Sequence, residues 1–379
     1  MATSELLERT PREAVILAAR LMVLGAEVRV VDAGIEQLSP RIVAREARWW
    51  HADLVLFEAG GCHMAADPVP DARPLARLLK ASWPDVPLLL RGPLGDRYGA
   101  ELLATFPQLG GVHTGTVGTW MVGGFDPDTA PGLLTRDGKQ QPAAVGVIED
   151  LPAWHLLPLT SYAGYGPRGA HVATIGERGD DLEGLLREVR HAVQRAGAGH
   201  LVFEARDLGE RRELTVDLTR RMFGAAPGVP WSCRVRADRL DPAFAVSLAQ
   251  GGCSEVLVTS PAPSSAPGLP PMDDPHREVL EAALEAVRVT GMTARAEFMV
   301  GRPGHRRSTL ESWQRWFAVR GVSVRPNVRR LHAGDQGAGS PDLKTARSRA
   351  GCWDNELSAG DVEKAVKRLQ RGVALGAGT

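Results

Sequence analysis

The stretch GVPWSCRVRADRLDPAFAVSLAQGGCSEVLV, residues 228–258, contains a complete strand–helix–strand unit. Residues 232–238 (SCRVRAD) and 254–260 (SEVLVTS) have the alternating and β-branched composition of strands. Residues 242–252 (PAFAVSLAQGG) between them have the apolar spacing of a helix. Two strands joined by a helix predict a βαβ unit, in which the strands are parallel.

The same alternation extends in both directions from this unit. Between residues 170 and 335 it predicts six strands, each followed by a helix except the last, which fits a partial (β/α)6 TIM-type barrel. A helical tail is expected over residues 336–379. The predicted strands cover 171–176, 200–205, 232–238, 254–260, 294–301 and 323–331, and the predicted helices cover 181–197, 213–223, 242–252, 276–291 and 308–321.

Residues 1–121 form a second, earlier alternation of helices and strands. A helix over 11–24 ends at Gly25 and leads to a strand over 27–33, and further strands are expected at 53–61, 86–93 and 111–113. This pattern predicts a Rossmann-like α/β domain with a parallel sheet. Residues 122–169 lose this periodicity and are expected to be a linker, although IEDLPAWHLLPLTSY (148–162) within it carries apolar anchors.

The composition favours a cytoplasmic chain with protein or small-molecule partners. At about 150 residues per domain, 379 residues suggest two domains. Lys plus Arg number 45, and so do Asp plus Glu, so the chain lacks the basic excess of a nucleic-acid-binding protein. It also lacks an apolar run that would predict a membrane span or a signal peptide. We therefore expect neither nucleic acid nor membrane as a partner.

Several stretches, in matching order and spacing, resemble the cobalamin-binding radical S-adenosylmethionine (SAM) enzymes. WPDVPLLLRGP (83–93) resembles the family stretch PDVPVVLGGPH, and residues 148–162 resemble its domain join LDDLPFPAWDLLPL. Residues 228–258 resemble its third and fourth barrel strands, and EFMVGRPGHRRSTLESW (297–313) resembles its fifth-strand turn FMIGLPGET. The resemblance implies an N-terminal cobalamin (B12) domain followed by a (β/α)6 barrel.

The cluster motif of that family is missing. There, the first barrel strand leads into CxxxCxxC, whose thiolates hold three irons of a [4Fe–4S] cluster and leave the fourth for SAM. Here the strand at 171–176 runs through Glu177, Arg178 and Gly179 into Asp180, which is expected to cap the next helix. The resemblance therefore implies no [4Fe–4S] cluster and no reductive cleavage of SAM by this chain alone. The cysteines are Cys62, Cys233, Cys253 and Cys352, too scattered for metal-binding pairs, and Cys233 and Cys253 are expected to be small buried residues.

Two further family features are altered. The acidic stretch that contacts the amino group of SAM reads FEARDLGERRE (203–213), and GIESGS is replaced by VTSPAPSSAPGLPP (258–271), so SAM binding is doubtful. Family members begin with a strand such as VLLVNPP, whereas this chain enters the helix at 11–24 directly. The first, central strand is therefore expected to be absent, unless a second chain or an upstream start codon supplies it.

Turn residues after the N-terminal strands are the candidate cobalamin contacts. They follow strands of a parallel sheet, whose carboxyl ends form the binding edge. Glycine permits close approach of a bulky planar ligand, and the histidine could face the corrinoid. The alternative of ordinary βα turns on a ligand-free surface stays open. The candidates are Gly60, Gly61, His63, Gly92, Pro93, Gly95 and Gly115; no metal ligands and no catalytic residues are assigned.

Structural explanations are preferred for the other conspicuous residues. Asp238 follows a barrel strand and could meet a substrate, but an ion pair with Arg234 or Arg236 is the plainer interpretation. Trp313, Trp316 and Phe317 share one helix face and are expected to be buried. The tryptophans at positions 49 and 50 are expected in the core or at an interface.

Two hypotheses about function follow. In the first, the chain is a cluster-free, non-catalytic subunit that forms a heterodimer with a radical SAM protein, as part of a cobalamin-dependent methyltransferase or a related biosynthetic enzyme. In the second, the chain has kept cobalamin and transfers methyl groups by polar, non-radical chemistry. A third and weaker hypothesis is a regulatory protein that binds a corrinoid. The sequence does not identify a small-molecule substrate.

Overall fold

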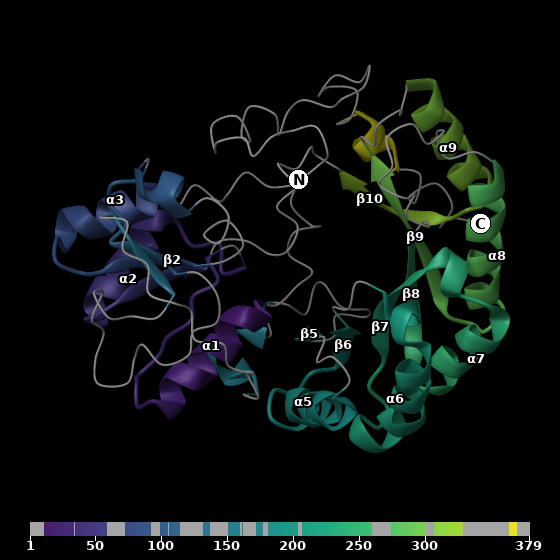
Figure 1. Cartoon of the computed structure of the whole chain (residues 1–379), viewed down its shortest axis with the longest axis horizontal. Coiled ribbons are helices and arrows are strands. Elements are labelled where there is room, and N and C mark those ends of the chain that lie inside the picture. The colour runs from purple at the N-terminus through teal and green to yellow at the C-terminus, as the bar shows by residue number, and fades with distance from the viewer. Residues whose placement is uncertain are drawn as a thin grey trace. The chain divides into compact units, whose positions relative to one another are not determined.

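The chain forms two compact α/β units in the computed structural model (Figure 1). One is built mainly from residues 11–162 and the other mainly from residues 163–332 and 348–379. None of the described helices combines the length and the apolar character needed to cross a bilayer. The described residues are 11–33, 35–58, 73–91, 99–104, 106–113, 132–136, 151–159, 161, 172–176, 181–203, 207–259, 274–300, 307–328 and 364–369.

The second unit is a six-stranded parallel sheet whose strand order follows the chain, β10-β9-β8-β7-β6-β5. Helices α5 to α9 lie along one side of it (Figure 1). All six strands and five helices predicted for this region are present. Their bounds are β5 (Val172–Ile175), α5 (Leu182–Gln194), β6 (His200–Phe203), η4 (Leu208–Arg211), α6 (Arg212–Ala225), β7 (Trp231–Arg236), η5 (Ala237–Arg239), α7 (Pro242–Gln250), β8 (Cys253–Thr259), α8 (Asp274–Arg288), β9 (Thr293–Val300), α9 (Arg307–Val319) and β10 (Ser323–Val328).

Along strand β7, buried side chains alternate with partly buried ones. Trp231, Cys233 and Val235 are buried, whereas the residues between them are only partly buried. The Trp231 ring meets the ring of Phe203 edge-on at 5.1 Å, and its Nε1 donates a 2.7 Å hydrogen bond to the carbonyl of Gly251. Because strand side chains alternate, one face of the sheet is packed and apolar and the other is free to carry polar groups.

The aromatic cluster predicted on α9 is confirmed. Trp313, Trp316 and Phe317 are 0%, 8% and 2% exposed, respectively. Phe298 of β9 packs against Trp313 at 5.2 Å and against Phe317 at 5.5 Å between ring centroids. Burial of such rings, at about 25 cal/mol per Å² of apolar surface, makes this contact a main attachment of α9 to the sheet.

Two local expectations in this unit have different outcomes. Asp181, not the predicted Asp180, caps α5, because its carboxylate accepts a 2.8 Å hydrogen bond from the Gly184 N–H. Asp180 lies outside the described residues. Cys233 and Cys253 are buried as expected, with their Sγ atoms 4.0 Å apart on neighbouring strands.

The first unit has a four-stranded sheet of order β1-β2-β3-β4. Leu17 and Leu21 of α1 cover one face, and residues of α2 and α3 cover the other. The first three strands are parallel and β4 is antiparallel to β3. The elements are α1 (Arg12–Val23), α2 (Pro40–Trp49), β1 (Val55–Glu58), α3 (Arg73–Ser82), β2 (Leu88–Arg91), β3 (Gly111–His113), β4 (Leu133–Thr135) and η1 (Trp154–Leu156), with residues 99–104 also helical.

The strand predicted over residues 27–33 is not formed. Gly25 ends α1 with a φ of +89°, as expected, but the segment after it pairs with no described strand. A strand is stable only beside a neighbour that accepts its backbone hydrogen bonds. The prediction was wrong because valine-rich alternation identifies a strand-forming segment without supplying that neighbour.

The predicted linker at 122–169 is partly structured. It contains β4, which pairs with β3, and Arg136 donates hydrogen bonds to the carbonyls of Leu103, Pro107 and Leu109 at 2.7, 3.1 and 3.1 Å. The apolar anchors expected within it are buried, with Trp154 at 1% exposure. The Ala153 N–H donates a 3.0 Å bond to the Val15 carbonyl of α1. These described parts therefore belong to the first unit.

Candidate functional site

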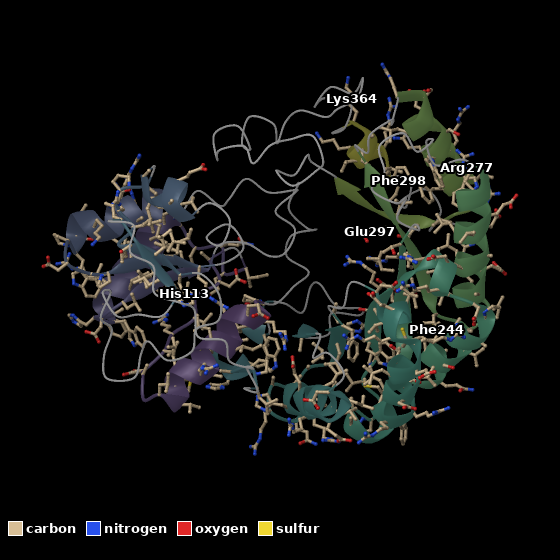
Figure 2. All side chains as sticks on the ribbon, viewed as in Figure 1. His113, Phe244, Arg277, Glu297, Phe298 and Lys364 are labelled. Carbon is tan, nitrogen blue, oxygen red and sulfur yellow. The ribbon has the colours of Figure 1, made fainter. Side chains whose placement is uncertain are left out.

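The polar face of the β5–β10 sheet is the candidate functional site that the structure describes. The parallel register places Ser232 beside Glu255, and Arg236 beside Thr259 and then Glu297. These side chains come from the partly exposed positions of their strands. Figure 2 shows Glu297 on the side of the sheet away from helix α8. Barrel enzymes place their active sites at the carboxyl ends of the strands, and Arg236 lies at that end of β7.

Two ion pairs cross this face. Arg234 on β7 donates a 3.2 Å hydrogen bond from Nη2 to Oε1 of Glu297 on β9, its Nε lies 3.1 Å from Oε2 of the same carboxylate, and each side chain is only 12% exposed. Arg295 on β9 lies 3.4 Å from the Glu255 carboxylate on β8. The Arg234–Glu297 pair spans the intervening strand β8. A guanidinium–carboxylate pair at this burial both joins strands and neutralises the charges it brings together.

Two aspartates at the carboxyl edge of the sheet, Asp207 and Asp238, bind nearby arginine residues. Asp238 binds Arg236 through two hydrogen bonds of 2.5 and 2.7 Å, and these hold the pKa of Asp238 below its usual range. This confirms the ion-pair interpretation of Asp238. Asp207, in the stretch that replaces the family's SAM-contacting segment, accepts hydrogen bonds from the backbone N–H groups of Gly209 and Arg236 and from the Arg239 guanidinium. Its carboxylate is engaged by the protein itself.

His200 is the buried titratable group of this face. It begins β6, is 2% exposed, and shares a 3.1 Å hydrogen bond between Nε2 and the Ser232 hydroxyl. Burial lowers the pKa of His200 to about 4. The ring is therefore neutral at pH 7, and its basicity is too low for an efficient general base.

The described residues do not fit a [4Fe–4S] cluster. Six residues, 176–181, separate the end of β5 from the start of α5, fewer than CxxxCxxC occupies, and none is cysteine. Cys233 and Cys253 project from the packed face of the sheet, opposite the polar one. Among the described residues, no group of three His, Cys, Asp or Glu side chains could hold a metal ion.

The turn residues predicted to contact cobalamin lie outside the part of the chain that the structure describes. This holds for Gly60, Gly61, His63, Gly92, Pro93, Gly95 and Gly115. Glu177 and Arg178, where the cluster loop would begin, also lie outside it.

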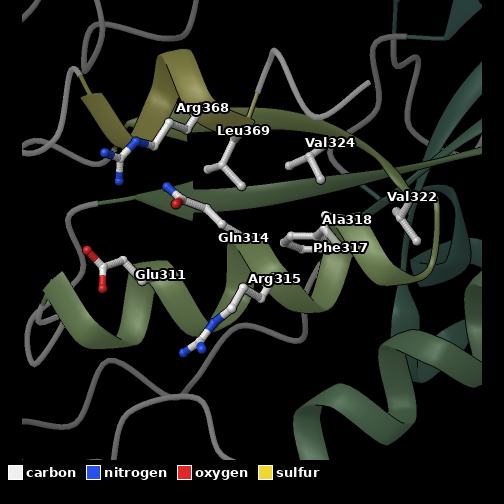
Figure 3. Close-up of a pocket in the computed structure, with 9 residues that line it drawn as sticks. All are labelled: Glu311, Gln314, Arg315, Phe317, Ala318, Val322, Val324, Arg368 and Leu369. Atoms are coloured by element: carbon white, nitrogen blue, oxygen red, sulfur yellow. The ribbon is translucent and has the colours of Figure 1, made fainter. Parts of the chain in front are cut away.

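A surface pocket of about 470 Å³ lies between α9, β10 and the helical residues 364–369 (Figure 3). Glu311, Gln314, Arg315 and Arg368 line it above an apolar floor that includes Phe317. Val324, in this floor, pairs with the buried Ala296, so the pocket lies on the helix-covered side of the sheet. It is separate from the polar face.

Sequence reasoning missed most of the polar face. It considered Arg234 and Arg236 only as partners of Asp238, and it did not single out His200, Asp207, Glu255 or Glu297. The available signal was the charged alternation in SCRVRAD (232–238) and ARAEFMVG (294–301). Charges at alternate positions of two nearby parallel strands point to the same face and can pair.

Solved structures with a similar fold include cobalamin-dependent radical SAM enzymes. The radical SAM methyltransferase TsrM from Kitasatospora setae, with cobalamin and a [4Fe–4S] cluster bound, matches with a TM-score of 0.63 and 17% identity, over 91% of this chain and 73% of that chain. TsrM with tryptophan and the SAM analogue aza-SAM bound matches with a TM-score of 0.64 and 17% identity, over 90% of this chain and 74% of that chain. The cobalamin-dependent SAM radical enzyme OxsB with aqua-cobalamin bound matches with a TM-score of 0.61 and 12% identity, over 96% of this chain and 55% of that chain. No protein-family model and no curated protein sequence matches the chain. At these identities the shared feature is the fold.

The Arg234–Glu297 pair predicts a large cost for removing one partner. Glu297→Gln should lower the free energy of unfolding by about 2–4 kcal/mol, because it removes the carboxylate charge that the poorly solvated Arg234 guanidinium faces. Asp217→Asn, which breaks the exposed pair of Asp217 with Arg220, should cost less than about 0.5 kcal/mol. Urea unfolding measures both values, and equal small losses would contradict the role assigned to the buried pair.

His200 predicts a pH dependence of stability. The unfolded histidine binds a proton near its ordinary pKa of about 6.5, whereas the folded one does so only near pH 4, so stability falls as the pH drops through this window. From about pH 7 to pH 5 this group should account for a loss of about 2 kcal/mol. In urea unfolding, the His200→Gln variant should lack this pH-dependent loss of stability. The His155→Gln variant, which changes an exposed histidine, should show the same loss as the unaltered protein. Equal pH dependence in both variants would refute the assignment.

Proposed function

We propose that this chain is a non-catalytic subunit of a cobalamin-dependent radical SAM methyltransferase or related biosynthetic enzyme, and that it acts in a complex with a cluster-bearing partner. The connection between β5 and α5 carries this proposal. It is six residues long and contains no cysteine, in a fold similar to enzymes such as TsrM. A fold can persist after the residues of its site have changed.

The sheet topology supports a finer assignment of the two units. Six parallel strands in chain order, with their connecting helices on one side, are consistent with a partial (β/α)6 barrel over residues 170–335. The first unit is consistent with a Rossmann-like, B12-type domain over residues 1–121. A linker at 122–169 and a helical tail at 336–379 complete the proposed organisation.

The electrostatics of the polar face also support a non-catalytic role. Its described charges are paired within the protein: Arg234 with Glu297, Arg295 with Glu255, and Arg236 with Asp238. Catalytic acids and bases usually have pKa values near the working pH. The histidine of this face is instead neutral at pH 7, so the described face resembles a structural interior more than a reaction site.

Co-expression with a radical SAM protein from the same genome tests the proposal. We expect the two proteins to purify as a complex, and methyl transfer to require both. A variant with all four cysteines replaced by alanine (Cys62, Cys233, Cys253 and Cys352) should support the same rate, because none of these thiols would hold the cluster. Circular dichroism melting serves as the folding control for that variant.

Three outcomes would contradict the proposal. One is a radical SAM protein that is fully active without this chain. Another is a folded cysteine-free variant that abolishes the activity of the complex. The third is an isolated chain that purifies with cobalamin, visible in its absorbance spectrum, and transfers methyl groups unaided. That last result would support polar methyl transfer, with cobalamin held at turns such as His63 and Gly92.

A further inference from the structure

The pocket between α9, β10 and the helical residues 364–369 has the size of a small-molecule site. Its volume of about 470 Å³ lies within the range of about 300–1,000 Å³ that is typical of ligand pockets. All of its lining residues are described, and all belong to the second unit. Because the pocket lies on the helix-covered side of the sheet, the proposed function leaves it without a role.

The floor of this pocket is apolar and held in place by packing. The Phe317 ring meets the rings of Trp313 and Trp316 at 5.4 and 5.1 Å between centroids. The Phe317 carbonyl also accepts a 3.0 Å hydrogen bond from the Val322 N–H, which fixes the turn between α9 and β10. A floor that is already ordered loses little conformational entropy when a ligand binds. The apolar lining residues are Phe317, Ala318, Val322, Val324 and Leu369.

The wall opposite α9 is anchored as well. Ala365 and Leu369, on the helical residues 364–369, are 4% and 3% exposed. Nε2 of Gln314 on α9 donates a 3.4 Å hydrogen bond to the Ala365 carbonyl. The two helical segments are therefore attached to each other, and the pocket between them is preformed.

Polar and apolar groups are separated within the pocket. Figure 3 shows Glu311, Gln314 and Arg368 toward one end, and Phe317 and Val322 toward the other. A molecule that fits this arrangement has a polar group at one end and an apolar body at the other. Such amphipathic molecules gain from apolar burial and polar contacts at the same time.

Basic side chains predominate around the polar end. A smaller hollow shares Glu311, Gln314 and Arg368 with the pocket, so the two adjoin. Glu311, the acidic residue of their described lining, has its charge matched by Arg307, whose Nε lies 3.3 Å from Oε1. The basic lining residues of the two hollows are Arg307, Arg315, Lys364 and Arg368.

This positive excess is a local feature with an energetic cost. The whole chain is balanced, with 45 basic and 45 acidic residues. Lys364 and Arg368 are four residues apart on one helical segment, a spacing at which like charges repel and destabilise a helix. An anion bound between these side chains and Arg315 would offset the repulsion.

We propose that this pocket binds a small amphipathic anion, a molecule with one carboxylate and an apolar body. The carboxylate would pair with Arg368, whose guanidinium can donate two parallel hydrogen bonds to it. The apolar body would lie over Phe317 and Val324. The proposal is independent of the proposed function, because the site is built from this chain alone.

Three matched probes test the class of ligand on the full chain without a partner. 4-Phenylbutyrate carries the carboxylate, 4-phenylbutyramide is its neutral analogue, and 4-phenylbutylamine is its cationic analogue. In titrations followed by saturation-transfer nuclear magnetic resonance, we expect the acid to bind with a Kd on the order of 1 mM or below. The amide should bind at least about tenfold more weakly, and the amine should not bind measurably.

Matched variants locate the site. Arg368→Gln and Arg315→Gln should each weaken binding of the acid at least about threefold, because each removes a positive charge from the lining. Arg195→Gln, which changes an exposed arginine after α5, should leave the affinity unchanged.

A second pair of variants tests the pocket without changing its charge. Ala318→Trp places a large ring at an exposed lining position and should abolish binding by filling the space. Ala282→Trp changes an exposed alanine of α8 and should leave binding unchanged. Circular dichroism melting checks that all four variants are folded.

Several results would overturn this inference. Equal affinities for the acid and the amide would exclude recognition of the anion. Undiminished binding to a folded Ala318→Trp variant would place the ligand elsewhere. Failure of the acid to bind the unaltered chain would remove the site altogether. None of these results bears on the proposed function, which is tested with the partner protein present.

Discussion

The cross-strand pairing of Arg234 with Glu297 depends on a constraint that organises the whole second unit: strand side chains alternate between two faces. On β7, alternation places Trp231, Cys233 and Val235 against the helices and leaves the arginines on the other face. Parallel register then brings the charged positions of β8 and β9 alongside them. The apolar face attaches the helices, including α9 through Trp313, and the polar face balances its own charges.

The same architecture explains how the fold can exist without the cluster of its structural relatives. Strand β5 is attached to the sheet by pairing with β6, and α5 begins at a cap supplied by Asp181. Neither feature requires a metal, so a six-residue connection is sufficient between them. The first unit differs in one respect, because residues 27–31 pair with no described strand.

Sequence patterns predicted the second unit well because each strand there has the neighbours that the pattern assumes. They failed at residues 27–33, where the valines suit a strand but no described strand pairs with the segment. They also missed β4, which is only three residues long and lies in a glycine-rich segment. The burial of Trp154 and of the α9 aromatics was predictable from apolar spacing. The Arg234–Glu297 pair was not, since it joins residues 63 positions apart that only the register brings together. The candidate cobalamin turns lie outside the described residues and stay predictions.

Iron binding is the most direct test of the central claim that this chain does not hold a [4Fe–4S] cluster. The purified protein is incubated anaerobically with iron, sulfide and reductant, desalted, and analysed for both elements and by electron paramagnetic resonance. The account predicts no stoichiometric iron or sulfide and no cluster signal, with or without SAM. A stable cluster at one per chain, with a signal that changes when SAM is added, would contradict it, because ligands other than the missing CxxxCxxC would then have to hold the iron.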